Sequence, residues 1–359
     1  MKKAYPRIVS GCGIVGIMNE KGNRMNGDLV IRAMRVMDER SNGLGAGFAG
    51  YGIYPKYRDY YAFHLMFDDE KSEEQTTQHL DRNFYLQKDE AIPTKPSPQI
   101  GNAPILRRYF VEIKSDMLSG DGTTADDFVV RNVMEINSKI KGAFVMSSGK
   151  NMGVFKSVGF PGDIAEFFRI RDYDAYTWIG HGRFPTNTPG WWGGAHPFTI
   201  LDYTVVHNGE ISSYGINKRY LEGFGYKCTL MTDTEVMAYL FDLLLRKHNV
   251  PIEIACLALA APFWSHIERM PEKKRKLLKA IRMVYGSALC NGPFAIILGH
   301  KDGMIGLNDR IKLRPQIAAR DKDMVYLASE ECAIREICPD PERIWSPKAG
   351  CPVIARLHF

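Results

Sequence analysis

The chain has 359 residues, of which 45% are hydrophobic and 25% are charged, so it can bury one large core or two smaller ones. It contains no run of roughly 18 apolar residues that could cross a bilayer and no long apolar stretch after its first ten residues, so we expect a cytoplasmic protein without a membrane partner. The net charge of +6 is spread along the sequence, and its densest basic cluster, Lys273 to Lys276, fits a solvated helix face better than a nucleic-acid-binding surface.

The predicted elements begin with a strand that leads into a helix. Apolar residues predict a strand over Gly13 to Met18, and apolar residues at helical spacing predict a helix over Asp28 to Glu39. A polar helix over Ser72 to Asn83 and a strand over Ile105 to Ile113 then flank T-K-P-S-P-Q-I-G (Thr94 to Gly101). The composition of that segment is typical of an exposed loop.

The rest of the chain contains further strands and helices in groups. Strands are expected at Ala143 to Ser147, Tyr176 to His181, Tyr203 to His207 and in short pieces from Pro293 to Arg356, and helices at Thr124 to Ile140, Pro161 to Phe168, Asp233 to Lys247 and Pro271 to Tyr285. Consecutive strands joined by short turns, with helices grouped between them, favour an α+β fold of stacked antiparallel sheets over a doubly wound parallel sheet.

Two features that signal a cofactor in other proteins do not do so here. The glycine-rich run Gly43 to Gly52 neither follows a strand and opens a helix nor has an acidic residue about twenty positions later, so it does not meet the dinucleotide-binding pattern. The seven cysteines include no C-x-x-C pair, so we expect no metal, cluster or other cofactor in this chain. Only Cys12 stands apart, because glycines flank it in S-G-C-G-I-V-G-I and leave its sulfur poorly screened.

Four separated segments have compositions suited to binding an amino-acid amide: Gly11-Cys12-Gly13, G-H-G-R-F-P-T-N-T (Gly180 to Thr188), V-V-H-N-G-E-I (Val205 to Ile211) and M-T-D-T-E-V (Met231 to Val236). In this order they resemble the class II glutamine amidotransferases, the family that includes amidophosphoribosyltransferase, glucosamine-phosphate synthase, asparagine synthetase and glutamate synthase. The resemblance implies L-glutamine as substrate. It also implies the fold of an N-terminal nucleophile hydrolase, a four-layer αββα sandwich of stacked antiparallel sheets.

The resemblance makes Cys12 the nucleophile. A cysteine at the start of a chain carries its own α-amino group, whose ordinary pKa is about 7.7 to 8.0, within reach of its thiol. One residue then supplies both nucleophile and base, provided that residues 1–11 are removed as a propeptide. Without the other segments, a small core residue after a glycine turn would be the better interpretation of Cys12.

The pair Asn208 and Gly209 is a candidate oxyanion hole. Because glycine leaves the turn unobstructed, the Asn208 side-chain amide and the Gly209 backbone N–H can point the same way and offer two donors to a developing oxyanion. The family uses the matching Asn-Gly pair in this role. The alternative is an ordinary N-G hairpin turn.

Two charged residues are candidates for binding the amino-acid end of glutamine. The planar fork of Arg183 suits a carboxylate better than a lysine does, and the resemblance assigns it the α-carboxylate. Asp233 could be merely a first-turn acid of its helix, but the family match assigns it the α-ammonium. Phe184 and Thr186 fall in the loop that closes over glutamine in relatives. Since a base is already available, we interpret three histidines as structural, namely His181, His196 and His207.

The last third of the chain points to one branch of the family. Four segments look like the end of the glutaminase domain of glutamate synthase, namely Asn291 to Gly299, Gly306 to Pro315, Val325 to Glu330 and Pro341 to Gly350. Residues Ala255 to Trp264 also resemble an insertion of that enzyme. By contrast, C-G-I-V-G-I and T-D-T-E-V are closer to the phosphoribosyl branch. We find no S-G-G-x-D-S loop and no phosphoribosyltransferase loop for an ammonia acceptor.

We therefore expect residues 12–359 to form one amidotransferase domain with insertions at about 55–175 and 250–290. It would hydrolyse glutamine and pass ammonia to a separate synthase subunit of a split glutamate synthase, and that partner would carry FMN and iron–sulfur clusters. The alternatives are a glutaminase subunit of another synthase, such as an N-methylglutamate synthase or an amidophosphoribosyltransferase-like enzyme, or a non-catalytic scaffold that senses glutamine. The adjacent Trp191 and Trp192 suit either ordering by a partner or simple core packing.

Overall fold

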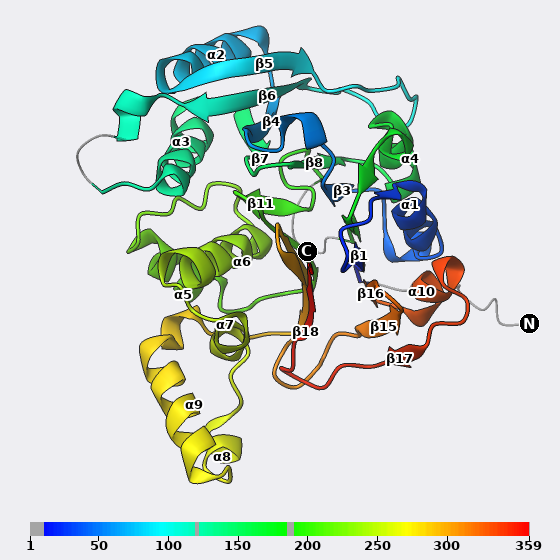
Figure 1. Ribbon diagram of the computed structural model, residues 1–359, viewed down its shortest axis with the longest axis vertical. Helices are drawn as coiled ribbons and strands as arrows, with labels where there is room; N and C mark the ends of the chain where they lie inside the picture. Colours follow the sequence, from blue (N-terminus) through cyan, green and yellow to red (C-terminus); the bar gives the residue numbers. More distant parts are fainter. Residues whose placement is uncertain (1–10, 119–121, 185–189, 359) are drawn as a thin grey trace, which may run out of the picture.

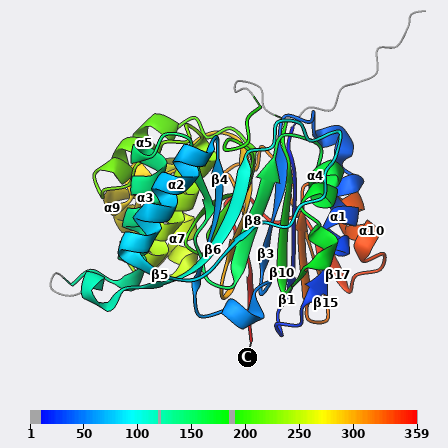
Figure 2. The same cartoon turned by 90° about the horizontal axis from the view of Figure 1, so that it is seen from above.

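The computed structural model describes residues 11–118, 122–184 and 190–358, which form four layers in the order helix, sheet, sheet, helix (Figures 1 and 2). In Figure 2 both sheets are seen nearly edge-on between two groups of helices. This arrangement confirms the predicted α+β class and the αββα sandwich.

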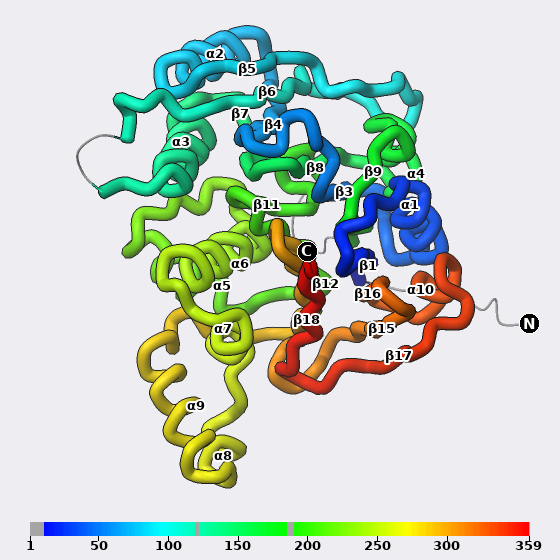
Figure 3. Tube along the Cα trace, in the orientation of Figure 1, coloured from blue at the N-terminus to red at the C-terminus, as the bar shows by residue number. Residues whose placement is uncertain are grey.

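The first central sheet has seven antiparallel strands in the order β17-β15-β16-β1-β10-β3-β8. Its strands are β1 (Gly13–Asn19), β3 (Ala46–Tyr51), β8 (Met152–Ser157), β10 (Thr177–Gly182), β15 (Ile317–Asp321), β16 (Met324–Ala328) and β17 (Arg343–Trp345). All seven residues of β1 are buried, because this strand lies in the middle of a sheet that is covered on both faces. Strand β1, the first strand of the chain, pairs with β16, which lies about 300 residues later in the sequence (Figure 3).

The second central sheet has five antiparallel strands in the order β11-β12-β13-β14-β18. Its strands are β11 (Phe198–Ile200), β12 (Tyr203–Gly209), β13 (Phe294–His300), β14 (Gly303–Asn308) and β18 (Val353–Arg356). Strands β12 and β13 face β1 and β10 across the middle of the sandwich. Apolar side chains from both inner faces fill that space, so the ends of β1, β10 and β12 are held close together.

Helices cover the two outer faces. On the seven-stranded sheet they are α1 (Asp28–Arg35), α4 (Pro161–Phe167) and α10 (Glu331–Ile337). On the other side α6 (Asp233–Phe241) packs on β11 and β12 and against α5 (Tyr214–Glu222). Also on this side are α7 (Ile252–Leu259), α8 (Trp264–Ile267) and α9 (Glu272–Val284), and α8 lies at the bottom of Figure 1.

The range 55–175 adds a third sheet, in the order β5-β6-β4-β7. Its elements are β4 (Tyr61–Phe67), α2 (Glu70–Asn83), β5 (Phe84–Ala91), β6 (Ile105–Ile113), α3 (Ala125–Lys139) and β7 (Ala143–Ser147). Strand β7 contacts both β8 and β11, so this sheet continues the sandwich at one end. A two-stranded ladder joins β2 (Met25–Asn26) to β9 (Asp174–Ala175). The proposed domain and insertion boundaries stay predictions.

Several predicted elements agree with the structure, and the differences have physical reasons. The predicted bounds of β6 and β7 match those observed, whereas the helix predicted over Asp233 to Lys247 is α-helical only to Phe241 and continues as a π-helix. The glycine-rich run includes β3, which the sequence did not reveal as a strand. A Cβ on Gly47 in this strand would lie 2.4 Å from the His196 carbonyl oxygen, so close packing explains the glycine. Within the described residues, no helix is long and apolar enough to cross a membrane.

Candidate functional site

Cys12 lies immediately before β1, at one end of the seven-stranded sheet. Pairing of Gly13 with Gly182 brings the cysteine opposite the residue after β10, which is Arg183. The Phe184 backbone N–H donates to Cys12 Sγ over 3.3 Å, and Arg40 Nε donates to the Cys12 carbonyl oxygen over 3.1 Å. The strand register thus places the nucleophile candidate and the arginine candidate side by side.

The surroundings of Cys12 make its thiol a poor acid. Burial raises the pKa of this thiol, and the Phe184 N–H and the Arg183 charge only partly oppose that effect. The thiol is therefore mainly protonated at neutral pH and needs a base to become a nucleophile. In the sequence as printed, the Cys12 nitrogen belongs to the peptide bond with Gly11, and an amide nitrogen cannot serve as that base.

Arg183 is buried to 6% exposure and is fixed by its own backbone. Its N–H donates to the Gly45 carbonyl oxygen over 2.8 Å, and Ser41 Oγ donates to its carbonyl oxygen over 3.2 Å. Burial lowers the pKa of the guanidinium, while Cys12 and Asp233 act in the opposite direction. Because an arginine remains charged in proteins, the guanidinium of Arg183 places a positive charge next to the Cys12 thiol.

Asp233 is the first residue of α6 and supplies the opposite charge. Its Oδ2 accepts the Ile211 backbone N–H over 2.9 Å and lies 3.5 Å from His207 Nδ1. Burial alone would raise the pKa of this carboxyl, but His207, the Ile211 N–H and the Thr234 hydroxyl outweigh burial and hold it below its ordinary value. Arg183 and Asp233 together therefore offer charges complementary to the α-carboxylate and α-ammonium of an amino acid.

The Asn208–Gly209 pair ends β12, in the sheet that faces β1. Asn208 is fully buried, and its Nδ2 lies 3.3 Å from Ser329 Oγ. Gly209 has a φ of +136°, and a Cβ at this position would lie 1.9 Å from the Pro293 carbonyl oxygen. Only glycine fits there, which explains the residue type on packing grounds.

The three histidines lie beneath the site in a buried cluster. His181 and His196 stack with ring centroids 4.1 Å apart, and His181 Nε2 lies 3.0 Å from the His207 carbonyl oxygen. Burial lowers the pKa of His181 to about 3, so this ring is neutral. His196 Nε2 and His207 Nδ1 both contact Thr234 Oγ1, at 2.7 and 3.3 Å. The cluster thus supports the start of α6 and, through it, Asp233.

The predicted glutamine-closing loop is described only in part. Phe184 is placed by its hydrogen bond to the thiol, whereas Thr186 lies outside the described residues. After the gap, Trp191 packs edge-on against Phe144 with centroids 5.3 Å apart. Trp192 packs similarly against Phe167 at 5.9 Å. Both tryptophans are half-buried, so at least part of each side chain serves core packing.

Further along, the buried Lys156 of β8 donates from Nζ to the Gly193 carbonyl oxygen over 3.1 Å and ties the segment after the tryptophans to the core.

Sequence reasoning missed four polar residues around Cys12. Arg40 forms an ion pair with Glu330 at 2.6 Å while it holds the cysteine carbonyl, and Ser329 contacts Asn208. A Cβ on Gly11 would lie 3.4 Å from an Arg314 guanidinium nitrogen. The only local signal was the Ser-Glu pair directly after the apolar run V-Y-L-A, and its proximity to the site depends on the pairing of β16 with β1.

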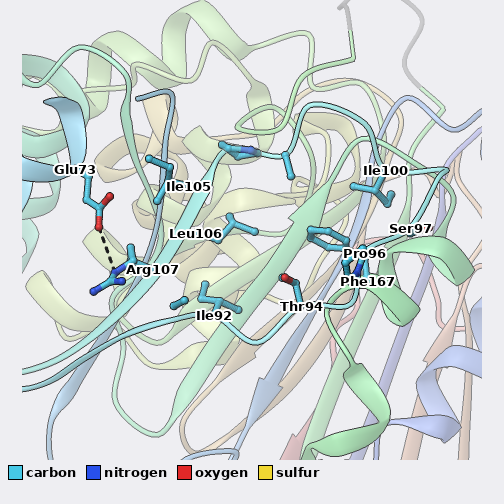
Figure 4. A pocket seen from close by; sticks show the side chains of 13 residues that line it. Glu73, Ile92, Thr94, Pro96, Ser97, Ile100, Ile105, Leu106, Arg107 and Phe167 are labelled. Atoms are coloured by element: carbon cyan, nitrogen blue, oxygen red, sulfur yellow. Dashed lines mark ion pairs between the residues drawn. The ribbon is translucent and has the colours of Figure 1, made fainter. Parts of the chain in front are cut away.

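A separate hollow of about 480 Å³ lies under the loop that follows β5 (Figure 4). Its lining includes Ile92, Ile100, Leu106 and Phe167, and an ion pair between Glu73 and Arg107 spans 3.4 Å at its edge. None of the described residues of the four segments around Cys12 contributes to its lining.

The chain is similar to known proteins over most of its length. Residues 90–344 match the family described as "Glutamine amidotransferases class-II". The chain is 54% identical to an uncharacterised protein of Archaeoglobus fulgidus over 96% of this chain and 92% of that protein. It is 25% identical to a provisionally named glutamine amidotransferase of Methanothermobacter thermautotrophicus over 92% of this chain and 95% of that one. Among solved structures, a glutamine phosphoribosylpyrophosphate amidotransferase from B. subtilis is 16% identical with a TM-score of 0.47, covering 96% of this chain and 47% of that chain.

Proposed function

The chain belongs to the class II glutamine amidotransferases, and from this premise we propose that it is the glutaminase subunit of a split glutamate synthase. In this proposal Cys12 hydrolyses L-glutamine, and the ammonia reaches an acceptor site on a separate synthase subunit. The observation that carries the catalytic part is the pairing of β1 with β10, which places Cys12 beside Arg183, where both feel the charge of Asp233.

The proposed reaction begins after cleavage between Gly11 and Cys12. The freed α-amino group of Cys12 takes the thiol proton, and the sulfur attacks the side-chain amide carbon of glutamine. Asn208 and Gly209 donate hydrogen bonds to the resulting oxyanion. The C–N bond then breaks, and the leaving nitrogen takes the proton back from the α-ammonium group and departs as ammonia. Water attacks the thioester and releases glutamate with the free thiol.

Binding of glutamine relies on the two opposite charges. Arg183 would hold the α-carboxylate through two parallel hydrogen bonds, and Asp233 would hold the α-ammonium. Phe184 and Thr186 would belong to the loop that closes over the substrate. Since the buried rings of the histidine cluster are already engaged in holding α6, they serve as support and not as the base.

The choice of glutamate synthase rests on the C-terminal third. The segments that resemble its glutaminase domain supply three residues near Cys12, namely Arg314, Ser329 and Glu330. FMN and iron–sulfur chemistry would then belong to the partner, which uses the ammonia. An N-methylglutamate synthase, an amidophosphoribosyltransferase-like enzyme and a glutamine-sensing scaffold are the competing proposals.

The test compares the isolated chain with the chain plus synthase subunit and 2-oxoglutarate. Because early hydrolysis would waste ammonia, we expect glutaminase kcat/KM to rise when the acceptor is present. Cys12→Ala is the control without a nucleophile. Equal values in both conditions would reject the split glutamate synthase in favour of a self-sufficient glutaminase, and no hydrolysis in either condition would favour the scaffold.

A further inference from the structure

Ser329 is bound to the strand that begins just after Cys12. It follows β16, and its side chain is buried. Its backbone N–H donates to the Ile14 carbonyl oxygen over 3.0 Å, and its Oγ accepts the Ile14 N–H over 3.1 Å. These two bonds hold the hydroxyl oxygen beside Ile14, which lies two positions after Cys12 in the sequence. Neither bond uses the hydroxyl proton, so this proton is free to donate to another group.

The Asn208 side chain lies next to this hydroxyl. Its Nδ2 lies 3.3 Å from Ser329 Oγ, while its Oδ1 is buried without a hydrogen-bond partner among the described residues. A Cβ on Gly11 would lie 3.7 Å from that Oδ1. The unsatisfied end of the amide thus faces the junction between Gly11 and Cys12, where the proposed chemistry takes place.

The two ends of an asparagine amide have nearly the same shape, so hydrogen bonds decide which end is the nitrogen. With Nδ2 toward Ser329, the serine oxygen accepts two hydrogen bonds and the Asn208 oxygen has none. With the amide turned by half a rotation, the serine hydroxyl donates to Oδ1 and still accepts the Ile14 N–H. The second arrangement gives both the Asn208 oxygen and the serine proton a hydrogen-bond partner, and it turns the Nδ2 donors toward the space beside Cys12.

We propose that Ser329 is a positioning residue that turns the Asn208 amide so that Nδ2 points at the space beside Cys12, where the oxyanion of the tetrahedral intermediate forms. This inference rests on the proposed glutaminase function. Ser329 acts only through Asn208, because its hydroxyl determines whether the nitrogen or the oxygen of the amide faces the oxyanion. Without that hydroxyl, the oxygen of the amide can face the developing negative charge and repel it.

The expected kinetic effect is specific. A donor that meets only the developing oxyanion contributes to kcat and leaves KM almost unchanged. We expect Ser329→Ala to lower kcat by up to roughly 10²-fold, near the lower end of the loss seen when a single oxyanion donor is removed. Ser329→Thr keeps the hydroxyl and should restore most of that loss.

A double-mutant cycle separates positioning from general damage. In an Asn208→Ala background, Ser329→Ala should cause no further loss of kcat, because the amide on which it acts is gone. Thermal unfolding of each variant controls for folding. An equal fold-loss of kcat in both backgrounds, or an unchanged kcat in Ser329→Ala, would overturn the proposal.

A neutron structure of the protein that starts at Cys12 determines the orientation of the Asn208 amide without any activity measurement. Deuterium on the amide nitrogen should lie on the side of Cys12, and the Ser329 deuterium should point to Asn208 Oδ1. Nitrogen facing Ser329 would refute this inference even in an active glutaminase. A turned amide in a protein that does not hydrolyse glutamine would refute the proposed function and leave the positioning role of Ser329 intact.

Discussion

The backbone N–H of Phe184 donates a hydrogen bond to Cys12 Sγ over 3.3 Å. It joins the end of β10 to the start of β1 and fixes the sulfur beside Arg183. The same contact stabilises negative charge on the sulfur, which partly offsets the effect of burial on the thiol pKa. The hydrogen bond therefore fixes the position of the sulfur, but the thiol still needs a base to remove its proton.

That requirement leads to a prediction about maturation. Because an amide nitrogen cannot accept the thiol proton, active protein should lack residues 1–11 and start at Cys12. Intact-mass measurement of active enzyme checks this. Full glutaminase activity in a chain that still begins at Met1 would remove the proposed mechanism.

The Arg183 clamp predicts a binding defect. Arg183→Lys loses the bidentate geometry, so glutamine binding should weaken by about 1.5–3 kcal/mol, the usual contribution of a hydrogen bond to a charged group. KM should then rise by roughly 10- to 100-fold. Steady-state kinetics measure it, with Arg58→Lys as a control at an exposed arginine. Cys12→Ala should abolish hydrolysis but still bind glutamine. An unchanged KM in Arg183→Lys would show that Arg183 does not bind the α-carboxylate.

Asp233 predicts recognition of the substrate's α-ammonium. Its pKa is held below the ordinary value, so the carboxylate is ionised at neutral pH. Wild-type enzyme should prefer glutamine strongly over 4-carbamoylbutanoate, which lacks the α-amino group. In Asp233→Asn that preference in kcat/KM should shrink by roughly tenfold or more, as expected for loss of a charge-assisted hydrogen bond. The exposed Asp59→Asn is the matched control. A preference retained in Asp233→Asn would show that another group binds the ammonium.

Lys156 predicts a pH dependence of stability. Burial lowers the pKa of this lysine to about 7, although Glu235 draws it upward. An unfolded lysine titrates near pH 10.4, so between about pH 7 and 10 the unfolded chain binds more protons than the folded chain. The contribution of Lys156 to the free energy of unfolding therefore rises with pH across this range. Below about pH 7 the lysine is charged in both states, and the full cost of burying that charge lowers the free energy of unfolding.

Urea unfolding at pH 7, 8.5 and 10 tests this. Lys156→Met should flatten the rise in the free energy of unfolding, whereas Lys150→Met, at an exposed lysine before β8, should keep the wild-type slope. Glu235, whose pKa burial raises to about 7, titrates mainly below this window. A wild-type slope in Lys156→Met would contradict the low pKa.

The sequence alone determined the layered α+β architecture and the family, because both depend on local patterns. Apolar periodicity and turn residues define most of the strands and helices, and the four short segments carry the family resemblance. Strand β3 was not predicted because the close approach of the His196 backbone requires a glycine at position 47, and this contact joins residues far apart in the chain.

Only the tertiary structure decided how the site is held. The register of β1 with β10 sets Cys12 beside Arg183, and the packing of α6 on β12 brings Asp233 to His207. The contact between Ser329 and Asn208 joins residues that are 121 positions apart, one directly after β16 of the first sheet and one in β12 of the second. Such contacts leave no local pattern, because their distances depend on how two sheets stack and not on the spacing of residues along either strand.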